Sequence, residues 1–362
     1  MRFPEFSGEW TKIKLGDLGS FFSGGTPSSS RKDFYGGEIP FIRSGELHSD
    51  STALSITKEA YDSCSAKMVN KGDLLLALYG ATSGDISISR ISGAINQAIL
   101  CIRPQYMDAY FIKSLWEKHK KHILETYLQG GQGNLSSEII KNISFFFPNN
   151  DEQVKISRLI HIIDDRIETQ TKIIEEQETL LKSLADKLFL QNNHSCQLSE
   201  LVNIEKGKQL NADTLSETGD YYVMNGGITP SGYYSEYNVP AGAISISEGG
   251  NSCGYVQFNE KPFWSGGHCY SLQCRTNLVD YKYIYYYLKT KESDVMALRI
   301  GSGLPNIQKK DIEKFTITYP SLQLQKQFVK SLDALSGKIN TEKNLLEKYC
   351  QQKSYLLSQM FI

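Results

Sequence analysis

The chain has 362 residues and a mass of 40.8 kDa, which is too long for one typical domain of about 100 to 200 residues, so at least two cores are expected. Hydrophobic residues make up 40% and charged residues 22% of the chain, which excludes a disordered protein. With 39 Lys and Arg against 40 Asp and Glu, the formal net charge is -1. The chain therefore lacks the excess of positive charge expected of a nonspecific nucleic-acid binder.

No apolar run approaches the roughly 20 residues that cross a bilayer, and the opening stretch MRFPEFSGEWTK lacks the apolar segment of a signal peptide. We therefore expect a soluble, cytoplasmic protein that does not contact a membrane. The seven cysteines are scattered without a CxxC pair, so we expect reduced thiols rather than disulfides or a zinc site.

The first domain is expected over residues 1–150. Strand-like runs alternate there with Gly/Ser/Thr loops: FFSGGTPSSS (21–30), EIPFIRSGEL (38–47), KGDLLLALYGATSGDISI (71–88) and GAINQAILCI (93–102). A helix is predicted around 109–128, so the fold class is α+β rather than all-β. The loops carry short polar donors and planar groups that can reach base edges and phosphates, although single Gly-rich loops are as often plain turns. These candidate DNA-binding residues are Thr26, Ser28, Arg31, Lys32, Arg43, Ser44, Tyr79, Thr82, Ser83, Gln132 and Asn134.

A single long helix is predicted over residues 151–190, where no Gly or Pro occurs. Apolar residues recur there with the 4-3-4-3 spacing of a heptad seam. The seam consists of Ile156, Ile160, Ile163, Ile167, Ile174, Leu181, Leu184 and Leu188, with Gln170 and Gln177 as polar members. We expect these two glutamines, and Glu342 in the second seam, to set the register of a coiled coil.

The second domain, over residues 191–321, repeats the rhythm of the first with strand-like runs at 204–210, 221–228, 240–256 and 266–274 and a helical stretch at 281–297. Its candidate DNA-binding residues are Lys206, Lys208, Gln209, Asn225, Asn251, Trp264, His268, Arg299, Ser302 and Asn306. A second long helix follows over 322–362 with the seam Phe328, Leu332, Leu335, Ile339, Leu346 and Leu356. Gly337 within this helix lowers its stability by about 1 kcal/mol relative to alanine, which a long helix tolerates.

An internal repeat organises the whole chain. A shift of 172 residues aligns 134–189 with 306–361 without a gap, and matches Asn134 with Asn306 and Gln153 with Gln325. The two apolar stripes can bury each other, which predicts an antiparallel intramolecular coiled coil with an approximate two-fold relation between the repeats and a length on the order of 55 Å. Dimerisation of the two helices with another chain remains the alternative.

The motifs GGTPS (24–28), IPFIRSGEL (39–47), KGDLLLALYGATSG (71–84), GGQGNLSSEIIKNISFFFP (130–148) and LADKLF (184–189), with the echo GSGLPNIQKKDIEKFTITYP (301–320), resemble the specificity (S) subunit of type I restriction-modification systems. The resemblance covers essentially the whole chain and includes the order of two target-recognition domains, each followed by a helix. The second domain departs from the pattern at its first loop, EKGKQLNAD, and at GGHCY.

The resemblance implies a noncatalytic DNA reader whose two domains each recognise one half of a bipartite, asymmetric target in double-stranded DNA. The paired helices would fix the gap between the halves and dock two modification (M) subunits, which carry S-adenosylmethionine and methylate adenine. Restriction (R) subunits would complete the assembly. This chain itself would hold no cofactor and no metal.

Enzyme chemistry finds no support in the sequence, which lacks GxxxxGK[ST], NPP[FY] and HExxH motifs. His119 and His122 fit a solvated basic face better than a metal site, and His268 and Cys269 alternate to opposite faces of a strand. Two rival functions stay open: a tandem-repeat scaffold or ligand-binding protein that oligomerises through its coiled coil, and the recognition half of a split methyltransferase without a nuclease.

Overall fold

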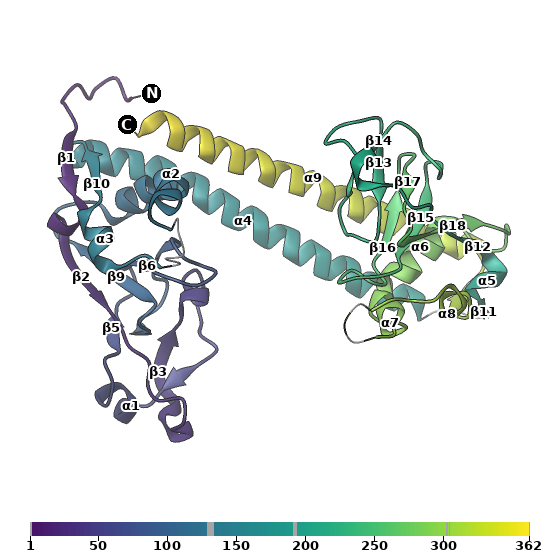
Figure 1. Ribbon diagram of the computed structural model, residues 1–362, viewed down its shortest axis with the longest axis horizontal. Coiled ribbons are helices and arrows are strands. Elements are labelled where there is room, and N and C mark those ends of the chain that lie inside the picture. The colour runs from purple at the N-terminus through teal and green to yellow at the C-terminus, as the bar shows by residue number, and fades with distance from the viewer. Residues whose placement is uncertain (1, 129–133, 191–193, 302, 304, 362) are drawn as a thin grey trace. The chain divides into compact units, whose positions relative to one another are not determined.

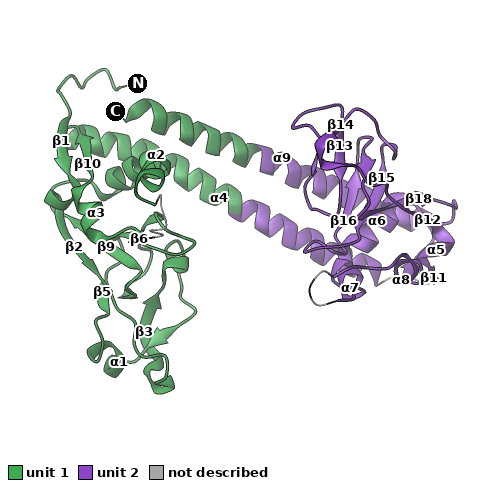
Figure 2. Ribbon diagram, viewed as in Figure 1, with its two compact units in different colours: residues 1–171, 345–362 green, residues 172–344 purple. Residues whose placement is uncertain are grey.

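The structure is a computed structural model that describes residues 2–128, 134–190, 194–301, 303 and 305–361 (Figure 1). Its described residues divide into two compact units, 1–171 with 345–362 and 172–344 (Figure 2). Each unit therefore contains one globular domain and one end of each long helix. Among the described helices, none is long and apolar enough to cross a membrane.

The described residues of unit 1 form three antiparallel or mixed sheets, with strand orders β2-β9-β6-β7, β4-β3-β8-β5 and β1-β10. Its strands are β1 Thr11–Lys14, β2 Gly19–Ser23, β3 Tyr35–Ile42, β4 Ser55–Ile56, β5 Lys67–Val69, β6 Leu74–Ala77, β7 Ile86–Ile88, β8 Gly93–Ile95, β9 Ile99–Pro104 and β10 Ser144–Phe147, and its helices are α1 Lys58–Asp62, α2 Ala109–Tyr127 and α3 Ser137–Asn142. Strand β6 is buried on both faces because α2 covers one side and the second sheet the other.

Unit 2 repeats this plan with strand orders β12-β18-β15-β16, β14-β13-β17 and β11-β19. Its strands are β11 His194–Gln197, β12 Val202–Lys206, β13 Tyr221–Met224, β14 Gly232–Tyr234, β15 Ala243–Ser247, β16 Val256–Asn259, β17 Trp264–Ser265, β18 Cys269–Cys274 and β19 Thr316–Tyr319, and its helices are α5 Leu198–Leu201, α6 Tyr281–Thr290, α7 Glu292–Ala297 and α8 Lys309–Glu313. The helix predicted over 281–297 is broken at Lys291, after which the Glu292 carboxylate accepts a hydrogen bond from the backbone nitrogen of Val256 at 2.8 Å.

The two long helices are α4 Asn150–Phe189 and α9 Leu322–Met360, of 40 and 39 residues. Each is about 60 Å long at 1.5 Å per residue. They run antiparallel within each unit: Asp164 of α4 pairs with Lys353 of α9 at 2.8 Å in unit 1, and Glu178 pairs with Lys343 at 2.6 Å in unit 2. The antiparallel intramolecular coiled coil is thus confirmed.

The apolar stripes are not used for helix pairing alone, which differs from the sequence-based expectation that the two stripes bury each other. Ile156 and Ile160 join the core of unit 1 together with Met360 and Phe361. Phe328, Leu332 and Phe189 likewise join the core of unit 2, where Leu181, Leu184 and Leu188 pack against it. The ends of both helices are consequently anchored in the globular domains.

Polar members of the seams differ in their surroundings. Gln170 is buried, Glu342 is half-buried, and both side chains have an interaction partner. The side-chain oxygen of Gln177 is buried without a hydrogen-bond partner among the described residues. Ile163, Ile174 and Ile339 are buried, whereas Ile167, Leu335, Leu346 and Leu356 are half-buried.

The glutamine that the two repeats share, Gln153 in the first and Gln325 in the second, has the same structural role in both. Gln153 accepts a hydrogen bond from the backbone of Asp108 at 3.3 Å and donates to the carbonyl of Pro148 at 2.9 Å. Gln325 does the same with Asp280 at 2.7 Å and Pro320 at 2.9 Å. Both glutamines are buried, and each ties the start of a long helix to the N-terminus of the domain helix that Asp108 or Asp280 caps.

Candidate nucleic-acid interface

The strand directions bring several loops to one edge of each globular domain. In unit 1, β2 and β6 both run antiparallel to β9, so their C-terminal ends lie beside the start of β9. Strand β3 runs parallel to β8, and the turn 96–98 after β8 leads directly into β9. The loops after β2, β3 and β6 therefore converge on this turn, and we call this region the recognition edge.

Four backbone hydrogen bonds close the recognition edge of unit 1, and four equivalent bonds close that of unit 2. In unit 1 the N–H groups donate to backbone carbonyls from Gly25 to Ile95 (3.2 Å), from Asn96 to Ile42 (3.3 Å), from Leu78 to Ala98 (2.8 Å) and from Leu135 to Leu78 (2.8 Å). In unit 2 they run from Lys208 to Ser265 (2.8 Å), Gly266 to Met224 (2.8 Å), Glu248 to His268 (2.9 Å) and Ile307 to Glu248 (2.8 Å). The same edge is thus built twice.

The loop after the central strand has one geometry in both units. Gly80 and Gly250 have φ values of 86° and 77°, in the left-handed region that favours glycine. The hydroxyl of Ser83 donates to the Leu78 carbonyl at 3.1 Å, and the thiol of Cys253 donates to that of Glu248 at 3.0 Å. The repeated asparagines close the loops, because Asn134 forms a β-bridge with Tyr79, and Asn306 with Gly249.

Most of the candidate residues lie on these recognition edges. The exposed ones, on the edges or the loops that run into them, are Thr26, Ser28, Arg43, Asn134, Lys206, Lys208, Gln209, Asn251, His268, Arg299 and Asn306. The half-buried ones are Ser44, Tyr79, Thr82, Ser83, Asn225 and Trp264. Gln132 and Ser302 lie outside the described residues.

Arg31 and Lys32 lie away from the edge, because they precede β3 while the C-terminal end of that strand forms the edge. Arg31 pairs with Asp33 at 2.6 Å and with Glu59 of α1 at 3.4 Å. Its guanidinium also stacks 4.2 Å from the ring of Phe34. These partners give Arg31 a local structural role.

Several edge residues are held by neighbours. Arg43 pairs with Glu46 at 3.1 Å, and that carboxylate also accepts from the backbone of Ala53 at 2.9 Å. In unit 2, the backbone nitrogen of His268 donates to Asn225 at 3.1 Å, and the indole of Trp264 donates to the Lys208 carbonyl at 2.9 Å. Such contacts preorganise the loops for binding.

Two edge residues were missed by sequence reasoning. Gln97, on the turn between β8 and β9, is hydrogen-bonded by the hydroxyl of Thr26. It also interacts with Tyr79, whose pKa is raised by burial and only partly lowered by Gln97. Glu248 is a buried acid that follows the buried strand β15. The only sequence signal for Glu248 was a charge at the end of an otherwise buried run.

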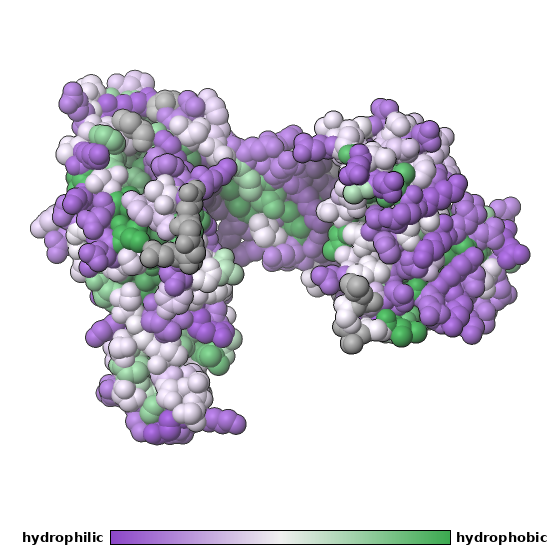
Figure 3. Space-filling model, in the orientation of Figure 1, coloured by the Kyte–Doolittle hydropathy of each residue, from purple (hydrophilic) through white to green (hydrophobic). Residues whose placement is uncertain are grey.

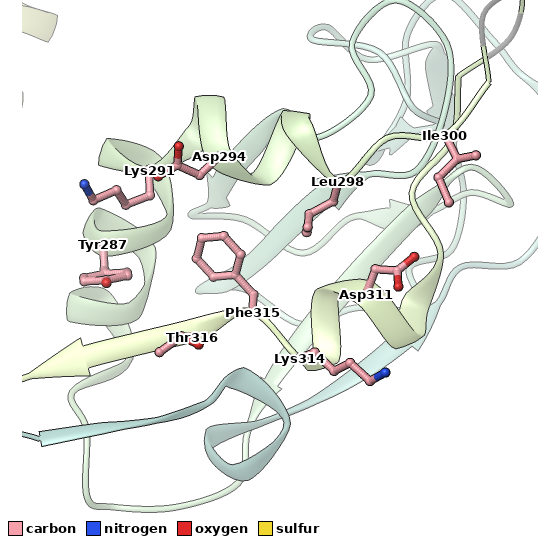
Figure 4. Close-up of a pocket in the computed structure, with 9 residues that line it drawn as sticks. All are labelled: Tyr287, Lys291, Asp294, Leu298, Ile300, Asp311, Lys314, Phe315 and Thr316. Atoms are coloured by element: carbon pink, nitrogen blue, oxygen red, sulfur yellow. The ribbon is translucent and has the colours of Figure 1, made fainter.

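Among the described residues, no group of three or more His, Cys, Asp or Glu side chains is arranged to hold a metal ion. The ring of His119 lies 5.3 Å from that of Phe145 and is tilted by 32° against it. A pocket of about 680 Å³ in unit 2 lies between the α6–α7 and α8–β19 segments, with Phe315 pointing towards the helices (Figure 4). Its charged residues are two lysines and two aspartates, Lys291, Lys314, Asp294 and Asp311.

Comparison with known proteins decides the family. Residues 7–179 and 192–348 both match the model of the type I restriction modification DNA specificity domain. The chain belongs to this family. These two segments are tandem copies of the specificity domain, and the family is noncatalytic.

Specificity subunits of type I restriction enzymes align with half of the chain or more. The specificity subunit of the type I restriction enzyme MjaVIII of Methanocaldococcus jannaschii is 22% identical over 396 residues, covering 96% of this chain and 91% of the relative. The specificity subunit of MjaIX from the same organism is 28% identical over 192 residues, covering 50% of this chain and 43% of the relative. A crystal structure of the type I restriction-modification S subunit from M. genitalium shares the fold, with a TM-score of 0.71, 21% identity and coverage of 100% and 99%.

Proposed function

We propose that this chain is the DNA-reading subunit of a type I restriction-modification complex, and that each unit reads one half of a bipartite, asymmetric target. The observation that carries the proposal is the recognition edge that occurs twice on one backbone plan with different side chains. Direct readout of DNA requires polar groups held at fixed positions on a rigid framework. Two such edges with different side chains would select two different short sequences.

The paired helices would set the gap between the half-sites and contribute to docking of two modification subunits. Besides the seam, α4 leaves Val154, Ile162 and Leu180 exposed at 49%, 45% and 57%. Hydrophobic side chains are visible along α4 on the face in Figure 3. Exposed apolar side chains on a long helix favour a protein partner.

The partners would supply the chemistry that this chain lacks. The modification subunits would bind S-adenosylmethionine and methylate adenine, and restriction subunits would join the complete assembly. Phosphate contacts from these partners would also compensate for the net charge of -1. Because the proposed DNA target lies there, the cytoplasm is the compartment in which we expect the protein.

Adenine-methylation mapping of the source genome, with and without this gene, tests the proposal. We expect deletion to remove one gapped, two-part methylation motif and to leave other motifs unchanged. An unchanged methylome in cells that express the chain together with a modification subunit would contradict the proposal and favour a scaffold.

A binding assay separates the same alternatives in vitro. The complex of this chain with its modification subunit should bind a duplex carrying the motif with salt-dependent affinity and discriminate against duplexes changed in either half. A scaffold or ligand-binding protein that oligomerises through its coiled coil would show neither behaviour.

A further inference from the structure

A buried carboxylate lies directly under the recognition edge of unit 2. Glu248 is 8% exposed, and its Oε1 accepts hydrogen bonds from the ammonium of Lys206 at 2.7 Å and from the hydroxyl of Tyr270 at 2.9 Å. Its Oε2 is buried without a hydrogen-bond partner among the described residues, and Nδ1 of His268 lies 3.7 Å from it. Burial, together with the hydrogen bond to Glu248, raises the pKa of Tyr270.

This arrangement holds two donor side chains at the surface. A buried carboxylate is costly unless charged or polar partners compensate it, so Glu248 draws Lys206 and His268 towards one point. The side chains of Lys206 and His268 nevertheless stay 53% and 62% exposed. They are therefore available to a ligand, while the carboxylate beneath them is not.

The matched positions of unit 1, all of which the structure describes, carry no counterpart of this cluster. The matched backbone hydrogen bonds align Glu248 with Leu78 and His268 with Ala98, and the β2–β9 and β12–β18 pairings align Lys206 with Ser23 and Tyr270 with Leu100. Leu78 and Leu100 are buried and apolar. The same backbone thus carries a charged cluster in one unit and, apart from Ser23, apolar side chains in the other.

We propose that Lys206 and His268 form a guanine-reading pair in unit 2, and that Glu248 positions them. The proposal rests on the proposed function of this chain as a DNA reader. In the major groove, guanine presents two adjacent acceptors, O6 and N7, whereas adenine, cytosine and thymine do not. Lys206 and His268 are two donors that converge on the same carboxylate, at 2.7 Å from Oε1 and 3.7 Å from Oε2, and two neighbouring donors match that pattern. The half-site read by unit 1 lacks this particular contact.

Substitution of single guanine atoms in the DNA tests the pair. Each guanine in the half-site of unit 2 is replaced in turn by 7-deazaguanine, which removes the N7 acceptor, and affinity is measured for the full chain with its modification subunit. We expect one position at which the wild-type complex loses about 5- to 150-fold in affinity. The His268→Ala complex should bind more weakly and no longer distinguish the two bases at that position.

Two further variants separate positioning from folding. Glu248→Gln keeps the shape of the side chain but removes its charge. We expect it to reduce the 7-deazaguanine effect, which is the loss of affinity when 7-deazaguanine replaces guanine at that position. Recognition of the other half-site should stay unchanged. His194→Ala is the matched control, because His194 is an exposed histidine of the same unit on β11, outside the recognition edge. It should retain the full effect.

The outcomes are distinct from those that test the function itself. Absence of guanine from both strands of the half-site of unit 2, or an unchanged 7-deazaguanine effect in His268→Ala, would overturn the guanine-reading pair while leaving DNA recognition intact. Absence of any motif-dependent binding by the wild-type complex would instead overturn the proposed function and, with it, this inference.

Discussion

At Gly24, the backbone of unit 1 passes too close to its neighbour for any side chain. A Cβ added there would lie 1.7 Å from the carbonyl oxygen of Ile95, which accepts the hydrogen bond from Gly25 that closes the recognition edge. Gly207, the equivalent residue of unit 2, has the same restriction, with a Cβ 2.2 Å from the Gly266 carbonyl. The first loop of unit 2 is poorer in glycine, but it retains glycine where the backbone requires it.

We therefore expect Gly24→Ala to lower the free energy of unfolding of unit 1 by about 3 kcal/mol or more, since overpacking against backbone cannot be relieved by a side-chain rotation. Urea denaturation measures the change. Gly45→Ala is the control, because no atom lies within 4 Å of a Cβ added there, and it should change stability by less than about 0.5 kcal/mol. Equal stability of the two variants would show that the close approach at Gly24 does not exist in solution.

At the scale of the elements, an ion-pair network joins three helices of unit 1. Asp164 of α4 pairs with Lys113 of α2 at 2.9 Å and with Lys353 of α9 at 2.8 Å, and it accepts a hydrogen bond from Tyr110. Glu117 of α2 completes the network through Lys113 and Lys353. Burial by itself would raise the pKa of Asp164, but the two lysines and Tyr110 outweigh it and hold this pKa below its usual range.

The sign of the pH dependence follows from that shift. Because the pKa of Asp164 is lower in the folded state, its contribution is fully present above the unfolded-state pKa of about 3.9 and is lost as the pH falls through the lower, folded-state pKa. Asp164→Asn should cost about 3 kcal/mol at neutral pH, since it leaves two lysines with a single acid. The difference from wild type should be constant above about pH 4 and shrink as the pH is lowered below it.

Urea denaturation over this pH range, with hydrogen exchange to assign the transition to α2 and α4, measures the effect. Asp165→Asn is the matched control, because Asp165 is adjacent, is 63% exposed and pairs with the exposed His161 at 3.3 Å. We expect it to change stability by less than about 0.5 kcal/mol. A pH-independent difference between Asp164→Asn and wild type would contradict the role of its ionised form.

The elements also show what the sequence can predict. Both long helices, the repeat and most strands were predictable because their patterns are local and periodic. The break at Lys291 was not, since it depends on Glu292 reaching the backbone of Val256, which is 36 residues away. The Glu248 cluster was equally hidden: its partners lie 42 and 22 residues away in sequence, and only the pairing of β12 and β15 with β18 brings them together.

At the scale of the whole molecule, the coiled coil offers a place where length can change without altering either unit. The division between the compact units falls after Thr171 in α4 and after Asn344 in α9. Insertion of four residues at both places lengthens each helix by about 6 Å and rotates it by about 40° beyond a full turn. Both cores and both recognition edges remain unchanged.

If the helices set the gap between half-sites, the insertion should lengthen the gap in the methylated motif while leaving both half-sites as they are. Lengthening each helix by about 6 Å corresponds to nearly two base pairs of DNA, at about 3.4 Å per base pair. Rotating it by about 40° corresponds to little more than one base pair, because DNA has about 10.5 base pairs per turn. We therefore expect a gap longer by one or two base pairs, read by methylation mapping. A variant with four exposed residues of each helix replaced by the inserted sequence keeps the helix length and should keep the gap. An inserted variant that methylates DNA with the original gap would exclude the coiled coil as the ruler, because its length would then have no effect on the spacing of the two edges.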